Sequence, residues 1–430
     1  MNYKQVVTSF LQIGEKILLV RRSQRVGTNR GKWSAVSGYL EGAEQPLTRA
    51  LTEIHEEVGL ASEQINLVRI GESLRAFDAE SDTVWVVHPF LFEARSDSVR
   101  LDWENVEYKW VKPEELALYQ TVPKLRETLD RVLYDLQRVP TSLASIIHKV
   151  EQLGEDRVHG ASFLGKQGVM LLSESAEGSD ARDSPSLFSH LLLVALRLRN
   201  AQPEMANVWN LAGRLLYRVD QGRNGESVGE VRELIQREAA RILEQVGEDS
   251  ENTSRTATQI LPAEGSILTH SYSNTVLRSL ELGFKGGRSL HVYATESYPG
   301  LEGKQFAKEL IARGVPVTLI ADSAVSSVIR NVHLVLVGAD SVLRDGSLVH
   351  KTGTREIGAT AKKHGVSLYS TCESVKFSVQ DFLGEPLQIQ STLFDVTPPD
   401  LISGYITEQG QLAPGHVEAR LKDLQRDVYP

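Results

Sequence analysis

Three glutamates in the first third of the chain have the spacing of a metal-binding group. Glu53, Glu56 and Glu57 stand at positions i, i+3 and i+4, which places all three on one face of a helix. Carboxylates this close raise one another's pKa unless a cation neutralises them. Mg²⁺ takes a few carboxylates and leaves its other positions to water and to substrate phosphate oxygens. The spacing therefore favours a divalent-cation site, and the alternative is a solvated acidic helix face.

The residues around these glutamates predict the helix that positions them. Pro46 suits the first helical turn, and Gly59 suits the position just past the end. We expect a short helix that buries an apolar face and holds the three carboxylates out as a dense patch of negative charge. The apolar side chains that recur at helical period are Leu47, Ala50, Leu51, Ile54 and Val58.

The stretch from Gly38 to Leu60 resembles the Nudix box, whose pattern is G-x5-E-x7-R-E-U-x-E-E-x-G-U with U an aliphatic residue. Thr52 stands where the family has an arginine that helps orient a glutamate, which predicts weaker activity with the metal ligands retained. The resemblance covers about residues 3–135. The positions that match the box are Gly38, Glu44, Glu53, Ile54, Glu56, Glu57, Gly59 and Leu60.

The resemblance implies an α/β/α sandwich that hydrolyses a nucleoside diphosphate linked to another moiety, with Mg²⁺ (or Mn²⁺) as cofactor. Glu53, Glu56 and Glu57 would hold the metal. Either of the last two would orient or deprotonate the attacking water.

Other residues would support this site. The backbone carbonyl of Gly38 would add a metal ligand, and Glu44 would support the loop and a second metal shell. Many Nudix enzymes supply a further carboxylate shortly before the closing strand. Glu104 is our candidate for it in preference to Glu107, and ordinary surface charge is the alternative.

Composition narrows the class of protein. The chain has 430 residues, enough for two or three domains, with an ordinary 41% of hydrophobic residues. Its net charge of −9 and lack of a basic block argue against direct nucleic-acid binding. The single cysteine, Cys372, excludes an intrachain disulfide and a multi-cysteine zinc site. No apolar run approaches the ~20 residues of a membrane span, and the start of the chain lacks a signal-peptide layout, so we expect a cytoplasmic protein.

Hydrophobic patterning divides the chain into three regions. Residues 1–139 read as short strands with a helix near 122–137. Residues 143–260 read as helices, interrupted by polar breaks at 173–186 and 248–252. Residues 261–430 alternate short aliphatic strands with helices, which predicts a parallel sheet of Rossmann type covered on both faces. Ligands of such sheets bind beyond the carboxyl ends of the strands.

Residues 143–425 resemble the alpha, beta and delta subunits of eukaryotic translation initiation factor 2B. This family is related to isomerases of methylthioribose-1-phosphate and ribose-1,5-bisphosphate. It implies a helical domain followed by a Rossmann-like domain, with dimerisation through the second. The segments that carry the resemblance are 267–273, 295–299, 337–340, 351–354 and 394–402.

The second resemblance also implies a ligand site, and its residues depart from the isomerases. Asp340 matches the isomerase aspartate, but Ser271 replaces the cysteine, and a serine is a poor proton donor at neutral pH. Tyr298 replaces an arginine, and His159 precedes Gly160 where the isomerases have Arg-Gly-Ala, so phosphate clamps are lost. These departures favour a regulatory role. The predicted ligand site comprises His159, Gly160, Ser271, Tyr298, Asp340 and Lys351.

The two resemblances together predict a Mg²⁺-dependent pyrophosphohydrolase acting on a small-molecule nucleotide of the ADP-ribose or nucleotide-sugar type. The second half would be a regulatory module that binds a sugar phosphate or nucleotide and forms a homodimer, with no membrane partner. Two alternatives remain open. One is a non-enzymatic regulator whose Nudix domain only binds, and the other is a sugar-phosphate isomerase that uses Asp340.

Overall fold

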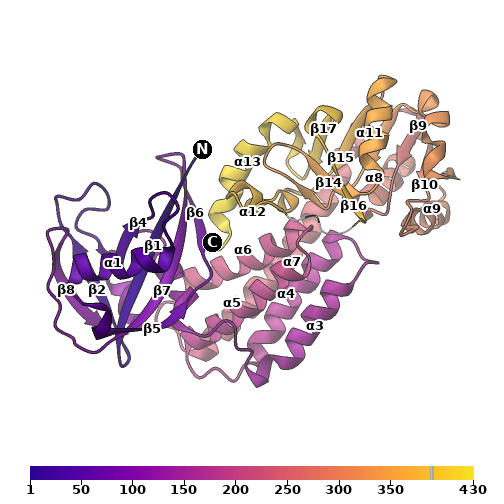
Figure 1. The fold of residues 1–430 in the computed structure, drawn as a ribbon. Helices are drawn as coiled ribbons and strands as arrows, with labels where there is room; N and C mark the ends of the chain where they lie inside the picture. The colour runs from indigo at the N-terminus through magenta and orange to yellow at the C-terminus, as the bar shows by residue number, and fades with distance from the viewer. Residues whose placement is uncertain (388, 390–391) are drawn as a thin grey trace.

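The computed structural model describes residues 1–387, 389 and 392–430, arranged in three parts along the chain (Figure 1). We call them the N-terminal part (2–133), the helical part (144–258) and the C-terminal part (264–430). The helical part lies between the other two and contacts both of them (Figure 1). The mixed α/β class, with a helical stretch before a largely parallel sheet, confirms the predicted fold class.

The N-terminal part is a mixed sheet held between two helices. Its strand order is β3-β2-β1-β7-β5, with β4 paired to β1, β6 to β7 and β8 to β2. Side chains of β1 alternate between two cores, Val7 facing helix α1 and Phe10 facing helix α2, as the period of a strand requires. The elements are β1 (Asn2–Ile13), β2 (Lys16–Arg22), β3 (Trp33–Ser34), β4 (Val36–Tyr39), α1 (Pro46–Val58), β5 (Ile65–Ile70), β6 (Leu74–Asp78), β7 (Thr83–Ala94), β8 (Asn105–Val111) and α2 (Leu125–Leu133).

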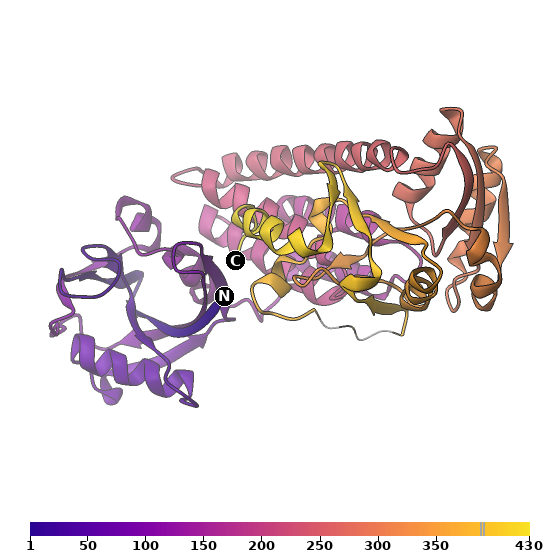
Figure 2. The same cartoon turned by 90° about the horizontal axis from the view of Figure 1, so that it is seen from above.

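The helical part packs its helices around a core of leucine and valine side chains. The longest helix, α7, runs along this part and reaches the C-terminal part (Figure 2). The helices are α3 (Ala144–Glu155), α4 (Ala161–Gly178), α5 (Ser184–Ala201), α6 (Ala206–Gly222) and α7 (Val228–Thr258).

Both predicted polar breaks in this part are wrong for most of their length. Helix α4 runs through 173–178, where the buried Ser175 hydroxyl donates to the Leu172 carbonyl. Helix α7 passes through 248–252 without interruption. There the hydroxyls of Thr253 and Ser254 donate to carbonyls four residues earlier, at 2.8 Å each. Polar residues continue a helix when their side chains find partners on it, which hydropathy alone does not show.

The C-terminal part contains a parallel sheet in the order β11-β10-β9-β12-β15-β17, with β18 added antiparallel at its edge. A small antiparallel sheet, β13-β14-β16, was not predicted. The elements are β9 (Glu264–Thr269), α8 (Asn274–Lys285), β10 (Ser289–Thr295), α9 (Glu302–Ala312), β11 (Val317–Ile320), α10 (Val325–Val328), β12 (Leu334–Val337), β13 (Ser341–Val342), β14 (Leu348–Lys351), α11 (Thr354–Lys363), β15 (Ser367–Thr371), α12 (Val379–Phe382), β16 (Phe394–Thr397), β17 (Gly404–Thr407), β18 (Gly410–Leu412) and α13 (Val417–Leu424).

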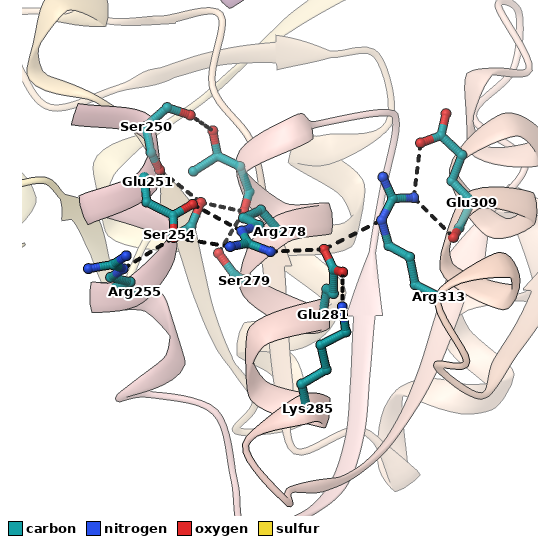
Figure 3. A network of polar contacts seen from close by, with 11 residues as sticks. Ser250, Glu251, Ser254, Arg255, Arg278, Ser279, Glu281, Lys285, Glu309 and Arg313 are labelled. Carbon is teal, nitrogen blue, oxygen red and sulfur yellow. Dashed lines mark hydrogen bonds and ion pairs between the residues drawn. The ribbon is translucent and has the colours of Figure 1, made fainter. Parts of the chain in front are cut away.

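A chain of ion pairs links the helical part to the C-terminal part (Figure 3). Arg278 on α8 donates to Glu251 on α7 at 3.0 Å and lies 3.3 Å from Glu281. Arg313, just after α9, lies 3.5 Å from Glu281 and 3.1 Å from Glu309. The polar residues near 251 thus serve as the attachment of α7 to α8 rather than as a loop.

The N-terminal part is joined to the rest through buried polar contacts. Asp130 on α2 accepts a hydrogen bond from Arg223, just after α6, and another from the Tyr429 hydroxyl at 3.0 Å. Nearby, the ring of Phe77 on β6 meets the edge of Phe382 on α12, with ring centroids 5.2 Å apart. Residues from all three parts therefore share one interface.

In the described part of the chain, no helix combines the length and the apolarity needed to cross a membrane.

Candidate functional site

Strand β4 and helix α1 place the predicted glutamates next to the sheet. Helix α1 begins at Pro46 and ends before Gly59, as predicted. Gly59 has φ +70°, a conformation that favours glycine, and its N–H donates to the His55 carbonyl at 3.1 Å. Ile54 is buried completely against the sheet. The cap and the apolar face thus set the rotation of the helix.

The carboxylates do not all face solvent, which corrects the sequence expectation. Glu53 and Glu57 retain only 6% and 4% of their exposure, whereas Glu56 stays exposed. For Glu53 the reason is the missing side chain at Gly38 on β4. A Cβ built there would lie 1.6 Å from Glu53 Oε1 and 2.4 Å from its Cγ. Gly38 therefore leaves room for a carboxylate to enter between the helix and the sheet. Its role as a metal ligand stays a prediction.

Glu57 is held from both sides by hydrogen-bond donors. The Ser37 N–H donates to Oε1 at 3.1 Å, and the Asn105 side-chain amide donates to Oε2 at 2.8 Å. Burial raises the pKa of Glu57 to about 8, against the lowering effect of these two donors, and the charges of Glu53 and Glu104 add to the rise. This carboxyl therefore carries a proton near neutral pH unless a cation replaces it.

The supporting carboxylate predicted at Glu104 lies close to this pair. Its charge raises the pKa of both Glu53 and Glu57, and its main chain is fixed by bonds to Asp102 and Ser23. Glu107 is instead paired with Arg21 at 2.9 Å. Glu44 lies near enough to Arg49 for its charge to help raise the pKa of that guanidinium.

Arg49 belongs to the candidate site by its contacts, and it was not singled out from the sequence. Its guanidinium pairs with Glu53 and lies 3.9 Å from Glu56, while the Thr52 hydroxyl donates to the Thr48 carbonyl. Arg49 thus contacts one glutamate of the box, as the family's arginine at position 52 would be expected to do. The spacing of Arg49 and Glu53, four residues apart on one helix, was the available signal.

The chemistry of these side chains, rather than their present placement, fits a hard divalent cation. Among the described residues, no group of three or more histidine, cysteine, aspartate or glutamate side chains is placed so that it could hold a metal ion. Burial raises the pKa of Glu53, Arg49 opposes the rise, and Glu56 and Glu104 add to it. Carboxylate oxygens are the ligands that Mg²⁺ and Mn²⁺ prefer. Mutual repulsion of this kind is what a bound cation relieves.

A second candidate site lies at the carboxyl ends of β9 and β10. The Ser271 N–H donates to the Ser297 hydroxyl at 2.7 Å, and both residues have positive φ, +66° and +61°. The Ser271 hydroxyl donates to Glu302 Oε1 at 3.1 Å, and Lys351 Nζ lies 3.8 Å from the same oxygen. Ser271 and Lys351, both predicted, are thereby brought together by Glu302, which was not. No sequence motif marked Glu302.

Asp340 lies in the same region, at the start of helix α4. It is 5% exposed, and the Ala161 N–H donates to its side chain, which puts Gly160 beside it. Burial raises the pKa of Asp340, Lys351 and Lys376 lower it, and Glu302 adds to the rise. The structure thus brings together Gly160, Asp340 and Lys351 as predicted.

Two predicted members of this site face elsewhere. The His159 ring pairs with Asp156 at 2.7 Å and stacks on Phe163. Tyr298 is 72% exposed, and its N–H donates to Asp322 Oδ2 at 2.7 Å. Neither residue supplies a buried anchor for a phosphate, in agreement with the loss of arginine at these positions.

Comparison with known proteins finds a family match for each half of the chain. Residues 3–132 match the NUDIX domain, and residues 157–414 match the initiation factor 2 subunit family. Because the second match covers more than half of the chain, the protein belongs to the initiation factor 2 subunit family. The chain thus joins a NUDIX domain to a domain related to initiation factor 2B subunits and to sugar-phosphate isomerases.

Individual relatives cover the second half alone. A Pyrococcus furiosus protein named as translation initiation factor eIF-2B subunit 2-like is 28% identical over 283 residues, which is 63% of this chain and 96% of that protein. Ribose 1,5-bisphosphate isomerase of Archaeoglobus fulgidus is 27% identical over 293 residues, covering 63% of this chain and 91% of the isomerase. The crystal structure of translation initiation factor eIF-2B from Pyrococcus horikoshii OT3 is 25% identical, with a TM-score of 0.54, and covers 64% and 98% of the two chains.

The raised pKa of Glu57 predicts a pH dependence of stability. The folded protein holds this proton up to pH about 8, whereas the unfolded chain releases it near 4.5. The stabilisation is therefore complete below pH about 4.5 and is lost as the pH rises through 8, by at most about 1.4 kcal/mol per pH unit. Urea denaturation in EDTA at a series of pH values, carried out on the wild type and on Glu57→Gln, measures this pH dependence of the free energy of unfolding. Parallel profiles for the two proteins would show that folding does not raise the pKa of Glu57.

Proposed function

We propose that the protein is a Mg²⁺- or Mn²⁺-dependent pyrophosphohydrolase that cleaves the diphosphate of a nucleoside diphosphate derivative, of the ADP-ribose or nucleotide-sugar type. The observation that carries the proposal is the carboxylate cluster of the NUDIX domain. Glu53 and Glu57 are buried beside Gly38, close to the charge of Glu104. A cluster of buried carboxylates is costly to maintain, and a substrate-binding cation gives it a use.

The burial and hydrogen bonds of each residue suggest a different role for it in the proposed reaction. Glu53 and Glu57 would hold the cation from the buried side of the cluster, because Glu53 lies against Gly38 and Glu57 is fixed by Ser37 and Asn105. Both oxygens of Glu57 already accept hydrogen bonds, so the exposed Glu56 is the carboxylate free to orient or deprotonate the attacking water. When bound, the cation supplies neutralisation of the diphosphate charge and activation of water. Arg49 would fix the orientation of Glu53.

The second half would act as a regulatory and dimerising module. Its candidate site would offer Lys351 to a phosphate, while the Ser271 hydroxyl is engaged with Glu302. The relative named as a ribose 1,5-bisphosphate isomerase supports a phosphorylated ribose or a nucleotide as its ligand. Homodimerisation through this half is supported by exposed apolar side chains near α9 and the edge strand β11, among them Ile311 and Leu319.

Hydrolysis of a substrate panel tests the proposed reaction. The purified full chain with Mg²⁺ should release products from ADP-ribose or a nucleotide sugar, and Glu56→Gln should lower the rate about 10²–10⁴-fold, the contribution of a general base. Glu63→Gln, an exposed glutamate outside the cluster, is the matched control and should keep full activity.

The same assay separates the proposal from its alternatives. If no compound in the panel turns over although the folded protein binds Mg²⁺, the NUDIX domain only binds and the hydrolase proposal fails. Added AMP or ribose 5-phosphate should change the rate if the second half regulates the first, and Lys351→Gln should remove that response without changing the basal rate.

The Arg49–Glu53 pair predicts that an arginine at position 52 can partly replace the arginine at position 49. Arg49→Met should lower turnover about 10–100-fold, as the loss of a group that orients a metal ligand does. Adding Thr52→Arg to this variant should restore part of the loss, because that position holds arginine in the family. Arg95→Met changes an exposed arginine of the same domain and serves as the control. Unchanged turnover in Arg49→Met would show that Arg49 does not position Glu53.

A further inference from the structure

The interface between the N-terminal part and the rest of the chain buries an arginine with incomplete partners. Arg131 on α2 is 1% exposed. It donates one hydrogen bond to the main-chain oxygen of Pro430, and its Nη1 lies 3.6 Å from Glu72 Oε2. Among the described residues, its Nε and Nη1 find no hydrogen-bond acceptor. A buried guanidinium whose N–H groups lack hydrogen-bond acceptors is destabilising. A ligand that supplies a hydrogen-bond acceptor to Arg131 would therefore be stabilised here.

A second arginine lies at the same interface and shares the same partner. Arg199 on α5 pairs with Glu72, and its guanidinium lies over the Trp209 ring, 5.3 Å from the centroid. The side chain of Glu72 is 40% exposed and serves both arginines. Burial lowers the pKa of Arg131 and of Arg199, and the charge of Glu385 opposes the change in each. Glu72 contacts both buried cations, and Glu385 acts on them through its charge.

These arginines line a cavity of about 50 Å³ at the junction of the three parts, near the place where Figure 1 marks the C-terminal end. By the measure in which one water needs ~10–15 Å³, the cavity has room for roughly four oxygens, the size of a tetrahedral oxyanion. The charged residues that line it are Arg75, Lys124, Arg131, Arg199 and Glu385.

The neighbouring charges leave a small positive excess. Glu72 and Glu385 together balance Arg131 and Arg199. Lys124 is paired with Glu127 at 2.9 Å, so the excess comes from Arg75, whose printed hydrogen bond goes to the neutral carbonyl of Leu383 at 3.3 Å. An apolar ligand would leave these groups unsatisfied, whereas phosphate oxygens accept bidentate hydrogen bonds from guanidinium groups. The chemistry of the lining therefore selects an oxyanion.

We propose that this cavity binds a phosphate group, either inorganic phosphate or the phosphoryl end of a small phosphomonoester, between Arg131 and Arg199. The lining residues come from β6 and α2 of the N-terminal part, α5 of the helical part and Tyr429 of the C-terminal part. A ligand here binds only when the parts are docked, so it stabilises their arrangement by mass action. The proposal depends neither on the proposed hydrolase activity nor on the candidate ligand site at Lys351.

Calorimetry and thermal unfolding of the full chain test this site, with inorganic phosphate and ribose 5-phosphate as probes and potassium chloride at matched ionic strength. Phosphate should bind and raise the unfolding temperature, and Arg199→Gln should weaken this binding about tenfold or more, as the loss of a bidentate partner does. Arg197→Gln removes an exposed arginine from the same helix and should leave binding unchanged. Because ribose 5-phosphate is also the proposed ligand of the Lys351 site, the two probes are compared in the Lys351→Gln variant. Stronger binding of ribose 5-phosphate there would favour a phosphomonoester as the ligand of this cavity, and equal or weaker binding would favour free phosphate.

Three further variants keep the test decisive. Lys351→Gln and Glu56→Gln should retain the phosphate response, which separates this cavity from the other two candidate sites. Arg75→Gln, at a partly exposed position of the lining, should also weaken binding and replaces Arg199→Gln if that variant does not fold. Binding that survives Arg199→Gln and Arg75→Gln, an equal loss in Arg197→Gln, or no response of the wild type up to about 10 mM of either probe would overturn the proposal.

Discussion

The burial of Glu53 and Glu57 against strand β4 is the constraint on which the candidate active site depends. Two carboxylates out of water are destabilising unless hydrogen bonds and opposite charge offset the loss of hydration. Ser37, Asn105 and Arg49 supply part of that offset. The remaining negative charge is what would attract a divalent cation to these side chains. The pairing of β4 with β1 and the capped helix α1 fix the backbone that carries Gly38, Glu53 and Glu57.

The sequence predicted the helix that carries this site, but it did not predict which of the glutamate side chains are buried. Helical spacing and the two helix-end residues gave α1 its observed bounds, because those signals are local. They could not show that Glu53 and Glu57 turn inward. Glu53 depends on the absent side chain of Gly38 in a neighbouring strand, and Glu57 depends on donors from Ser37 and Asn105. The same limit hid Glu302, which joins Ser271 to Lys351 across the C-terminal part.

The contacts between the two halves could not be predicted from the sequence. Asp130, Arg223 and Tyr429 form one buried polar contact but lie far apart in the chain, with no motif to connect them. The strand-helix alternation that predicted the C-terminal sheet says nothing about such contacts. The fusion therefore differs from two independent domains on a linker, because charged side chains of each half are buried in the other's surface and a ligand at Arg131 and Arg199 would contact both.

The central claim, that the buried carboxylates form a divalent-cation centre, is tested most directly by Mn²⁺ binding to the full chain, followed by electron paramagnetic resonance. The account predicts a bound Mn²⁺ that is lost or weakened about tenfold or more in Glu53→Gln and Glu57→Gln, while the exposed control Glu63→Gln binds like the wild type. Binding that is absent in the wild type, or unchanged in both cluster variants, would contradict it.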